Sequence, residues 1–115
     1  MRQAVREEAV ALGFGLVDQT KIVTAASELG RNALIHGGGG HIQIAHVATA
    51  GRHGLRLAFV DHGPGIRDIE QAMKDGFTTG TGLGLGLGGA RRLVNEFHIE
   101  SAPGKGTQVT IVRWR

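Results

Sequence analysis

Cysteine and tyrosine are absent from this chain of 115 residues, which holds one tryptophan and two prolines. The lack of cysteine excludes disulfides and cysteine-ligated metal sites, and it is compatible with a reducing cytoplasm. No apolar run approaches the roughly 18 residues of a membrane span, and the segment MRQAVREEAV at the N-terminus lacks the apolar stretch of a signal peptide. We therefore expect a soluble, cytoplasmic protein with no membrane partner.

The scarcity of aromatic side chains also argues against nucleic-acid binding, although the net charge is +3. The basic residues are scattered along the chain with acidic residues between them, and a single tryptophan offers little for base stacking. Hydrophobic residues make up 41% and charged residues 20%, as in globular proteins. A chain of this length builds one core, so residues 1–115 are expected to form a single domain without a nucleic-acid partner.

Glycine, by contrast, is abundant, and it is concentrated in residues 76–89, GFTTGTGLGLGLGG. Ala90, Leu93 and Phe97 then follow at helical spacing, which predicts a glycine loop that leads into a helix N-terminus. Free backbone N–H groups and the helix dipole make such an arrangement suitable for phosphate. A flexible surface loop before an ordinary helix explains the same pattern, and neither the phosphate-loop motif nor the Rossmann motif is present.

The hydrophobic periodicity predicts helices before and after a first pair of strands, and a second pair of strands at the end of the chain. Asp18 is expected to cap the second helix, residues 37–40 to be a flexible joint and residues 51–54 a turn. This order predicts an α+β two-layer sandwich with helices on one face of a mixed, mostly antiparallel sheet. The expected helices are 1–12, 18–36, 68–74 and 87–97, and the expected strands are 41–49, 55–61, 98–101 and 107–114.

Three polar positions attract attention within these elements. Glu28 and Asn32 are four residues apart, hence on one face of the second helix, although an exposed polar face gives the same pattern. Asp61 ends a strand in which Leu57 and Phe59 share its face, so its carboxylate is expected to point inward. The alternative is that Asp61 caps the tight turn HGPG that follows it.

The motifs ELGRN at 28–32, DHGPGI at 61–66 and GTGLGLGLGG at 80–89 resemble, in that order, the nucleotide-binding boxes of the gyrase, Hsp90, histidine kinase and MutL (GHKL) ATPase superfamily. The resemblance spans nearly the whole chain and implies the Bergerat-type ATP-binding fold. Within the superfamily the chain resembles the small anti-sigma-factor serine/threonine kinases. The segments SELGRNALIHGGGG, DGFTTGTGLGLGLGGARRLVNEF and GKGTQVTIVRW are similar to a switch kinase of the bacterial stressosome.

For the adenine base, the resemblance implies that Asp61 binds the amino group, a task that suits a buried carboxylate acceptor. It also implies that Gly63 and Gly65 let the backbone pass close to the base and that the Thr107 hydroxyl forms a hydrogen bond near it.

For the phosphates, the resemblance implies that Asn32 supplies its amide oxygen to Mg²⁺ and that Glu28 is the general base for an attacking hydroxyl. Gly82, Gly84 and Gly86 would wrap the phosphates ahead of the helix.

The function implied is a protein kinase that uses ATP and Mg²⁺ to phosphorylate a STAS-domain antagonist in a bacterial stress-signalling partner switch. A PP2C-type phosphatase or a sigma factor would be its second partner. The alternative is a non-catalytic, nucleotide-dependent module that sequesters a sigma factor or activates the phosphatase, but a pure binder has no need of Glu28 as a base. A histidine-kinase catalytic domain is disfavoured by the short segment between Gly65 and Gly82.

Two features depart from the family pattern. Relatives usually open with a strand before the first helix, whereas this chain begins within that helix, so one sheet edge is expected to be uncovered or covered by a second copy. We therefore hypothesise a homodimer. His62 follows Asp61 directly and is interpreted as a solvated turn residue, and the remaining histidines show no spacing suited to zinc.

Overall fold

A computed structural model describes residues 1–65, 73 and 86–115 of the chain. The helix expected at residues 68–74 lies outside this part except for Met73, and so do residues 76–85 of the glycine loop. The described elements, in chain order, are α1 (Arg2–Ala11), α2 (Leu16–Gly37), β1 (Gly40–Thr49), β2 (Arg52–Asp61), α4 (Gly86–Arg92), β3 (Glu96–Ser101) and β4 (Thr107–Trp114).

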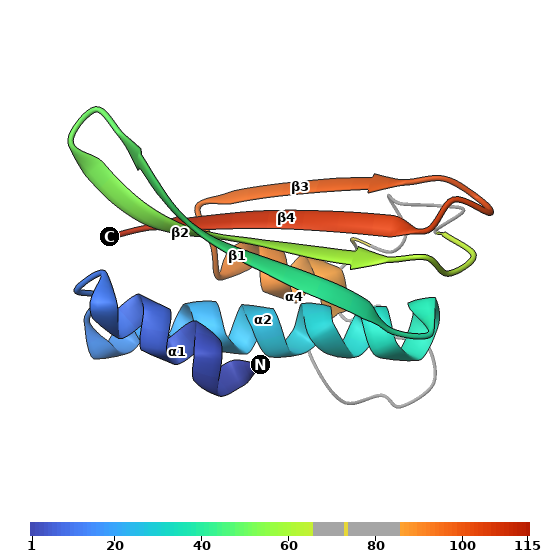
Figure 1. Cartoon of the computed structure of the whole chain (residues 1–115), viewed down its shortest axis with the longest axis horizontal. Helices are drawn as coiled ribbons and strands as arrows, with labels where there is room; N and C mark the ends of the chain where they lie inside the picture. The colour runs from blue at the N-terminus through green and yellow to red at the C-terminus, as the bar shows by residue number, and fades with distance from the viewer. Residues whose placement is uncertain (66–72, 74–85) are drawn as a thin grey trace.

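The four strands form one sheet in the order β1-β2-β4-β3, and each neighbouring pair is antiparallel. The three described helices lie together on one face of this sheet (Figure 1). The predicted α+β two-layer sandwich is confirmed, and the described strands make the sheet antiparallel throughout rather than mixed. No described helix is both long enough and apolar enough to cross a membrane.

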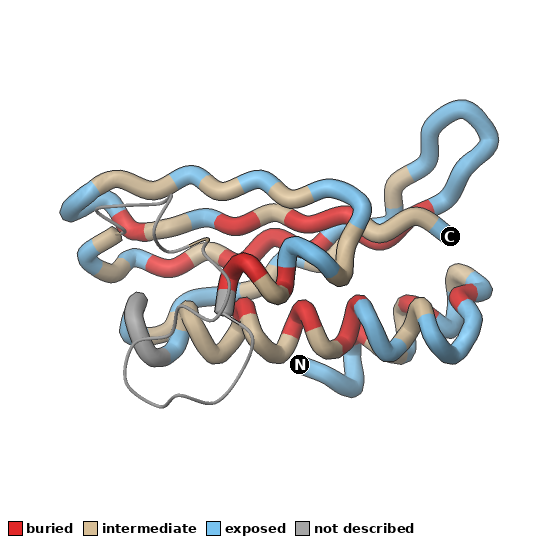
Figure 2. Tube along the Cα trace, turned by 180° about the vertical axis from the view of Figure 1, so that it is seen from behind, coloured by how far each residue is buried: buried red, intermediate tan, exposed pale blue. Residues whose placement is uncertain are grey.

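The core lies between α2 and the sheet, where two apolar rows cross all four strands. The strand register defines these rows as Ile42, Phe59, Val109 and Ile99, and Ile44, Leu57, Ile111 and Phe97. The central strands β2 and β4 supply the buried members of these rows, and the buried residues of α2 lie on the side of the helix that faces them (Figure 2). The buried residues of α2 are Ile22, Val23, Ala25, Ala26 and Leu29.

Polar residues flank these apolar rows on the same helix-facing side of the sheet. At one end lies the row Gly40, Asp61, Thr107 and Ser101, which we call the Asp61 row. At the other end lies the row His46, Leu55 and Arg113, which we call the Arg113 row. The inward-facing side of the sheet is therefore apolar in the middle and polar toward both ends.

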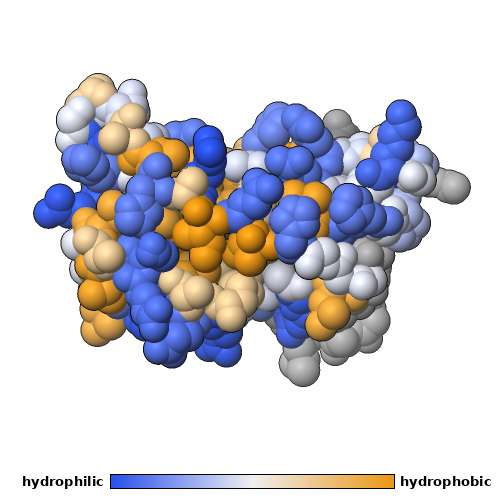
Figure 3. Space-filling view, viewed as in Figure 1, coloured by the Kyte–Doolittle hydropathy of each residue, from blue (hydrophilic) through white to orange (hydrophobic). Residues whose placement is uncertain are grey.

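The β1 edge covers the core incompletely. Ile42 and Ile44 are only half-buried, and apolar side chains reach the surface along the line where the helices meet this strand (Figure 3). Among the described strands, β1 has a neighbour on one side only. The edge left by a missing first strand and the homodimer both stay predictions.

The N-terminal boundary of α2 corrects the sequence prediction. The helix begins at Leu16 with Gly15 as its N-cap, and no side chain caps it. Asp18 lies in the first turn instead, where its Oδ1 accepts a hydrogen bond of 2.6 Å from Arg113 Nη2. The prediction that Asp18 is the cap is wrong because β4 supplies a stronger, charged partner for its carboxylate.

The predicted helix at 87–97 is too long at its C-terminal end. It ends at Arg92, and the Asn95 N–H already donates to the Val112 carbonyl of β4 at 3.0 Å. Phe97 belongs to β3 and lies opposite Ile111. Helical spacing and strand alternation both fit Phe97, and pairing with β4 decides for the strand.

The two short glycine segments were also placed differently from the prediction. The turn between β1 and β2 consists of Ala50 and Gly51, so β2 begins at Arg52 inside the segment expected to be a turn. Gly37 closes α2 and Gly40 opens β1, which leaves two residues between these elements.

Candidate functional site

Asp61 ends β2 and is the one charged or polar residue among those described that is classed as buried, with 9% of its surface exposed. The inward orientation predicted from the alternation is confirmed. The predicted alternative also holds, because Oδ1 accepts a hydrogen bond of 3.0 Å from the Gly63 N–H in the following turn. This is the one hydrogen bond that described residues make to the carboxylate, so further lone pairs remain for a ligand with N–H groups.

Thr107 lies directly across from Asp61 in the β2–β4 register, on the same face of the sheet. Its hydroxyl is 2.8 Å from that of Ser101, the next residue of the Asp61 row, and the Ser101 hydroxyl donates to the Gly106 carbonyl at 3.0 Å. The structure thus places Thr107 beside Asp61, as the proposed adenine site requires. Sequence reasoning missed Ser101, which alternation with Phe97 and Ile99 would have placed on the same face.

The loop after Asp61 packs tightly against the turn between β3 and β4. The Gly104 N–H donates to the Pro64 carbonyl at 2.6 Å. Gly65 has a φ of +82°, and a Cβ there would lie 2.1 Å from the Ala102 carbonyl oxygen. Gly106 has a φ of +77°, and a Cβ there would lie 2.2 Å from the Asp61 carbonyl oxygen.

The close packing against the turn between β3 and β4 explains why position 65 is a glycine, because a side chain there would clash. The approach of Gly65 to a base, like that of Gly63, stays a prediction. Sequence reasoning assigned no role to Gly106 beyond its place in the segment GKGTQVTIVRW. Both glycines hold the two loops that frame Asp61.

Glu28 and Asn32 lie in the C-terminal half of α2 and are partly buried. Glu28 Oε2 accepts a hydrogen bond of 2.8 Å from Arg31 Nη2, and 15% of the Glu28 side chain is exposed. The α2 helix ends three residues before Gly40, which pairs with Asp61, so this half of α2 points toward the Asp61 end of the sheet (Figure 1). The predicted catalytic pair and the Asp61 row therefore occur at the same end of the molecule.

The glycine loop itself lies largely outside the described residues. Gly82 and Gly84 lie outside the described residues, whereas Gly86 is the first residue of α4. Leu87 and Ala90 of this helix are buried in the core, where α4 contacts α2. The loop is therefore anchored on its C-terminal side to the helix that carries Glu28 and Asn32.

Histidine and acidic residues do not form a metal-binding cluster in the described ranges, where no group of three such side chains could hold an ion. Asn32 and Glu28 nevertheless offer an amide and a carboxylate one helical turn apart, and oxygen donors of this kind suit Mg²⁺ when nucleotide phosphates complete its shell. His62 is exposed, as predicted, and its ring centroid lies 6.5 Å from that of His41.

Comparison with known families identifies the family to which the chain belongs. Residues 17–115 match the family described as histidine kinase-, DNA gyrase B-, and HSP90-like ATPase. The chain belongs to this ATPase family. The predicted superfamily and its fold are therefore confirmed, whereas the placement of the base at Asp61 and Thr107 stays a prediction.

Individual relatives refine the family assignment. The chain is 49% identical to the serine/threonine-protein kinase RsbT of Bacillus subtilis (strain 168), across 98% of this chain and 85% of the relative. It is 33% identical to an anti-sigma F factor of Thermoanaerobacter sp. (strain X514), across 98% of this chain and 82% of the relative. These similarities confirm the predicted branch of the family and agree with the prediction of a serine/threonine kinase.

Proposed function

We propose that this chain is an ATP-dependent serine/threonine protein kinase that phosphorylates a STAS-domain antagonist protein in a bacterial stress-signalling partner switch. The observation that carries the proposal is the meeting, at one end of the fold, of the Asp61 row with the half of α2 that bears Glu28 and Asn32. Family membership makes ATP the nucleotide expected at this end.

Adenine recognition falls to Asp61 and Thr107. The Asp61 carboxylate is buried and accepts one hydrogen bond from the Gly63 N–H, so it can accept another from the exocyclic amino group of the base. A buried acceptor of this kind rejects ligands that lack the matching donor, because the carboxylate would then be left unpaired. Gly63 and Gly65 complete the rim beside it.

Phosphoryl transfer falls to α2 and the glycine loop. When bound, Mg²⁺ would neutralise phosphate charge, and Asn32 would hold it through the amide oxygen. Glu28 accepts the proton of the substrate hydroxyl while the hydroxyl oxygen bonds to the γ-phosphorus and the bond to the β–γ bridging oxygen breaks, which releases ADP. Gly82, Gly84 and Gly86 contribute backbone N–H groups to the phosphates.

The proposed partners follow from the same kinship. The substrate is a STAS-domain antagonist, and the second partner is a PP2C-type phosphatase or a sigma factor. We propose that the protein acts in the bacterial cytoplasm and forms a homodimer through the β1 edge. These assignments rest on the names of the relatives and on the edge chemistry of the sheet.

Incubation of the purified chain with labelled ATP, Mg²⁺ and a panel of STAS domains tests the kinase proposal. Glu28→Gln is expected to lower kcat about 10²- to 10⁴-fold, the usual contribution of a general base, with ATP affinity nearly unchanged. Glu7→Gln is the matched control, because Glu7 is exposed on α1. Transfer at the wild-type rate by Glu28→Gln would remove Glu28 from the mechanism.

A non-catalytic binding module is the second candidate, and the ion pair between Glu28 and Arg31 favours it. One oxygen of the Glu28 carboxylate lies 2.8 Å from the Arg31 guanidinium and accepts a hydrogen bond from it, whereas a general base needs an oxygen that can accept the substrate proton. In this case the chain binds ATP without transfer to any STAS domain. It would then capture a sigma factor or activate the phosphatase equally well with Glu28→Gln.

A further inference from the structure

Ser101 connects two groups that frame the proposed base site. Its hydroxyl is 3.0 Å from the Gly106 carbonyl oxygen and 2.8 Å from the Thr107 hydroxyl oxygen. Gly106 in turn packs against the Asp61 carbonyl, and Thr107 lies across from Asp61 in the sheet. One side chain at the end of β3 thus contacts a residue that packs against the Asp61 backbone and a residue that lies opposite Asp61 in the sheet.

The chemistry of these contacts fixes which atom supplies each hydrogen. A carbonyl oxygen can only accept, so the single hydrogen of the Ser101 hydroxyl goes to Gly106. The hydrogen between the two hydroxyls must then come from Thr107. With its own hydrogen directed to Ser101, the Thr107 oxygen presents lone pairs to any other group that approaches it.

Two hydrogen-bond acceptors consequently lie next to each other on the inward-facing side of the sheet. The Asp61 carboxylate and the Thr107 oxygen occupy opposite positions on adjacent strands. Side by side, they favour a ligand group that carries N–H donors and disfavour one that carries a carbonyl, because facing acceptors repel each other and stay unpaired.

We propose that Ser101 is a positioning residue for nucleotide specificity: by taking the Thr107 hydrogen, it makes Thr107 an acceptor beside Asp61 and so selects a 6-amino purine over a 6-oxo purine. The proposal rests on the proposed function, in which this row binds the base. Ser101 itself touches neither base nor phosphate in this role.

The setting of Ser101 keeps this hydrogen-bond pattern in place. The Gly106 carbonyl cannot turn away easily, because its residue packs against Asp61 and has a φ of +77°. The neighbouring Gly104 N–H is bonded to the Pro64 carbonyl. The acceptor for the Ser101 hydroxyl therefore belongs to a turn that is held on both sides.

ATP and ITP provide the test, since ITP carries an oxygen in place of the 6-amino group and a hydrogen on N1. Their dissociation constants are measured by calorimetry for the wild type, Ser101→Ala and Ser101→Thr. Ser101→Ala frees the Thr107 hydroxyl to rotate and donate, so the preference for ATP over ITP is expected to fall about three- to tenfold, the effect of one hydrogen bond. Ser101→Thr retains the hydroxyl and therefore the preference for ATP.

Thr110→Ala is the matched control, since it removes a hydroxyl from β4 on the opposite side of the sheet. In a Thr107→Val background, Ser101→Ala should change the preference no further, because the group it orients is gone. Equal losses of ATP and ITP affinity in Ser101→Ala would show a merely structural role and overturn the proposal, as would an unchanged preference. A wild type that binds neither nucleotide would refute the proposed function itself.

Discussion

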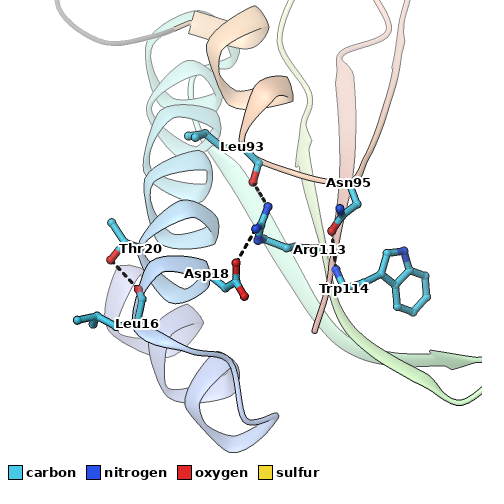
Figure 4. A network of polar contacts seen from close by, with 7 residues as sticks. All are labelled: Leu16, Asp18, Thr20, Leu93, Asn95, Arg113 and Trp114. Carbon is cyan, nitrogen blue, oxygen red and sulfur yellow. Dashed lines mark hydrogen bonds and ion pairs between the residues drawn. The ribbon is translucent and has the colours of Figure 1, made fainter.

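The two polar rows of the helix-facing side of the sheet differ in where their hydrogen bonds go. In the Arg113 row, Arg113 Nη2 donates to Asp18 at 2.6 Å and Nη1 donates to the Leu93 carbonyl at 2.9 Å, which joins β4 to α2 and to the segment after α4 (Figure 4). In the Asp61 row, the carboxylate receives one bond from the described part of the chain. Both terminal nitrogens of Arg113 are bonded within the protein, although its Nε is buried without a hydrogen-bond partner among the described residues. Hydrogen bonds made within the protein serve the fold, whereas the unused lone pairs of the Asp61 carboxylate are available to a ligand.

The contrast between the rows depends on the packing that holds Asp61 in place. Substitutions at two glycines of the turn between β3 and β4 test this packing. Gly106 and Gly104 have nearly equal φ values, +77° and +76°, but a Cβ would clash only at Gly106. Gly106→Ala is expected to lower the free energy of unfolding by about 2 to 4 kcal/mol, from backbone strain plus overpacking. Gly104→Ala carries the strain alone, at about 1 kcal/mol. Urea titration measures both, and equal losses would refute the close packing against Asp61.

A second test compares the two carboxylates directly. Asp61→Asn replaces one acceptor oxygen with a donor, so we expect ATP affinity to fall about 100-fold, the upper range for a hydrogen bond to a charged group. Asp18→Asn makes the same replacement of an oxygen by an amino group at the other end of the sheet. This variant is expected to leave ATP affinity within about twofold. Calorimetric titration compares the two variants. Similar losses of affinity in both would abolish the distinction between a ligand-binding end and a structural end.

The structural end is tested by Arg113→Met, which retains the apolar stem of a side chain that is 15% exposed but removes both hydrogen bonds. The expected loss is about 1 to 2 kcal/mol of unfolding free energy, since Asp18 and the Leu93 carbonyl lose a charged donor. ATP affinity of the folded variant should be unchanged. Arg113→Lys is expected to restore part of the stability, because a lysine can reach one of the two acceptors but not both. A large loss of ATP affinity at full folding would show that this row also serves the site.

The smallest expected effect concerns the two sheet edges. The sequence of β1 holds no Asp, Glu, Lys or Arg, whereas β3 carries Glu96 and Glu100. Charged residues protect edge strands from pairing, so we expect β1 to mediate the proposed homodimer. Gln43→Lys should weaken self-association a few-fold in sedimentation equilibrium, while Gln108→Lys on the central β4 should not. A monomer at high concentration would contradict the proposal.

Much of the fold could be predicted because its periodicities are local. The alternation in β2 placed Leu57, Phe59 and Asp61 on one face, and the structure buries all three. The errors occur where a tertiary partner decides the outcome. Phe97 fits a helical stripe until it pairs with Ile111, and Asp18 suits a helix cap until Arg113 approaches from β4.

The residues expected to bind the ligand could be predicted from the sequence, but the residues that hold them in position could not. Asp61 and Thr107 followed from the motifs and their resemblance to a family, and the sheet register brings them opposite each other. Ser101 lies outside the motifs, and Gly106 lies within GKGTQVTIVRW without a role assigned to it. Ser101 contacts residues five and six positions further along the chain, whereas the packing of Gly106 against Asp61 joins segments more than 40 residues apart, for which local sequence gives no signal.

The position of β4 between β2 and β3 also has a consequence for the order of assembly. Strand β4 supplies Thr107, and the turn before it supplies the Gly104 N–H that donates to the Pro64 carbonyl in the loop after Asp61. A chain still emerging from the ribosome, with α1, α2, β1 and β2 already made, therefore has Asp61 but lacks the rest of the proposed base site. If the proposed site is right, nucleotide binding requires β4, and bound ATP stabilises only molecules in which β4 has been inserted into the sheet.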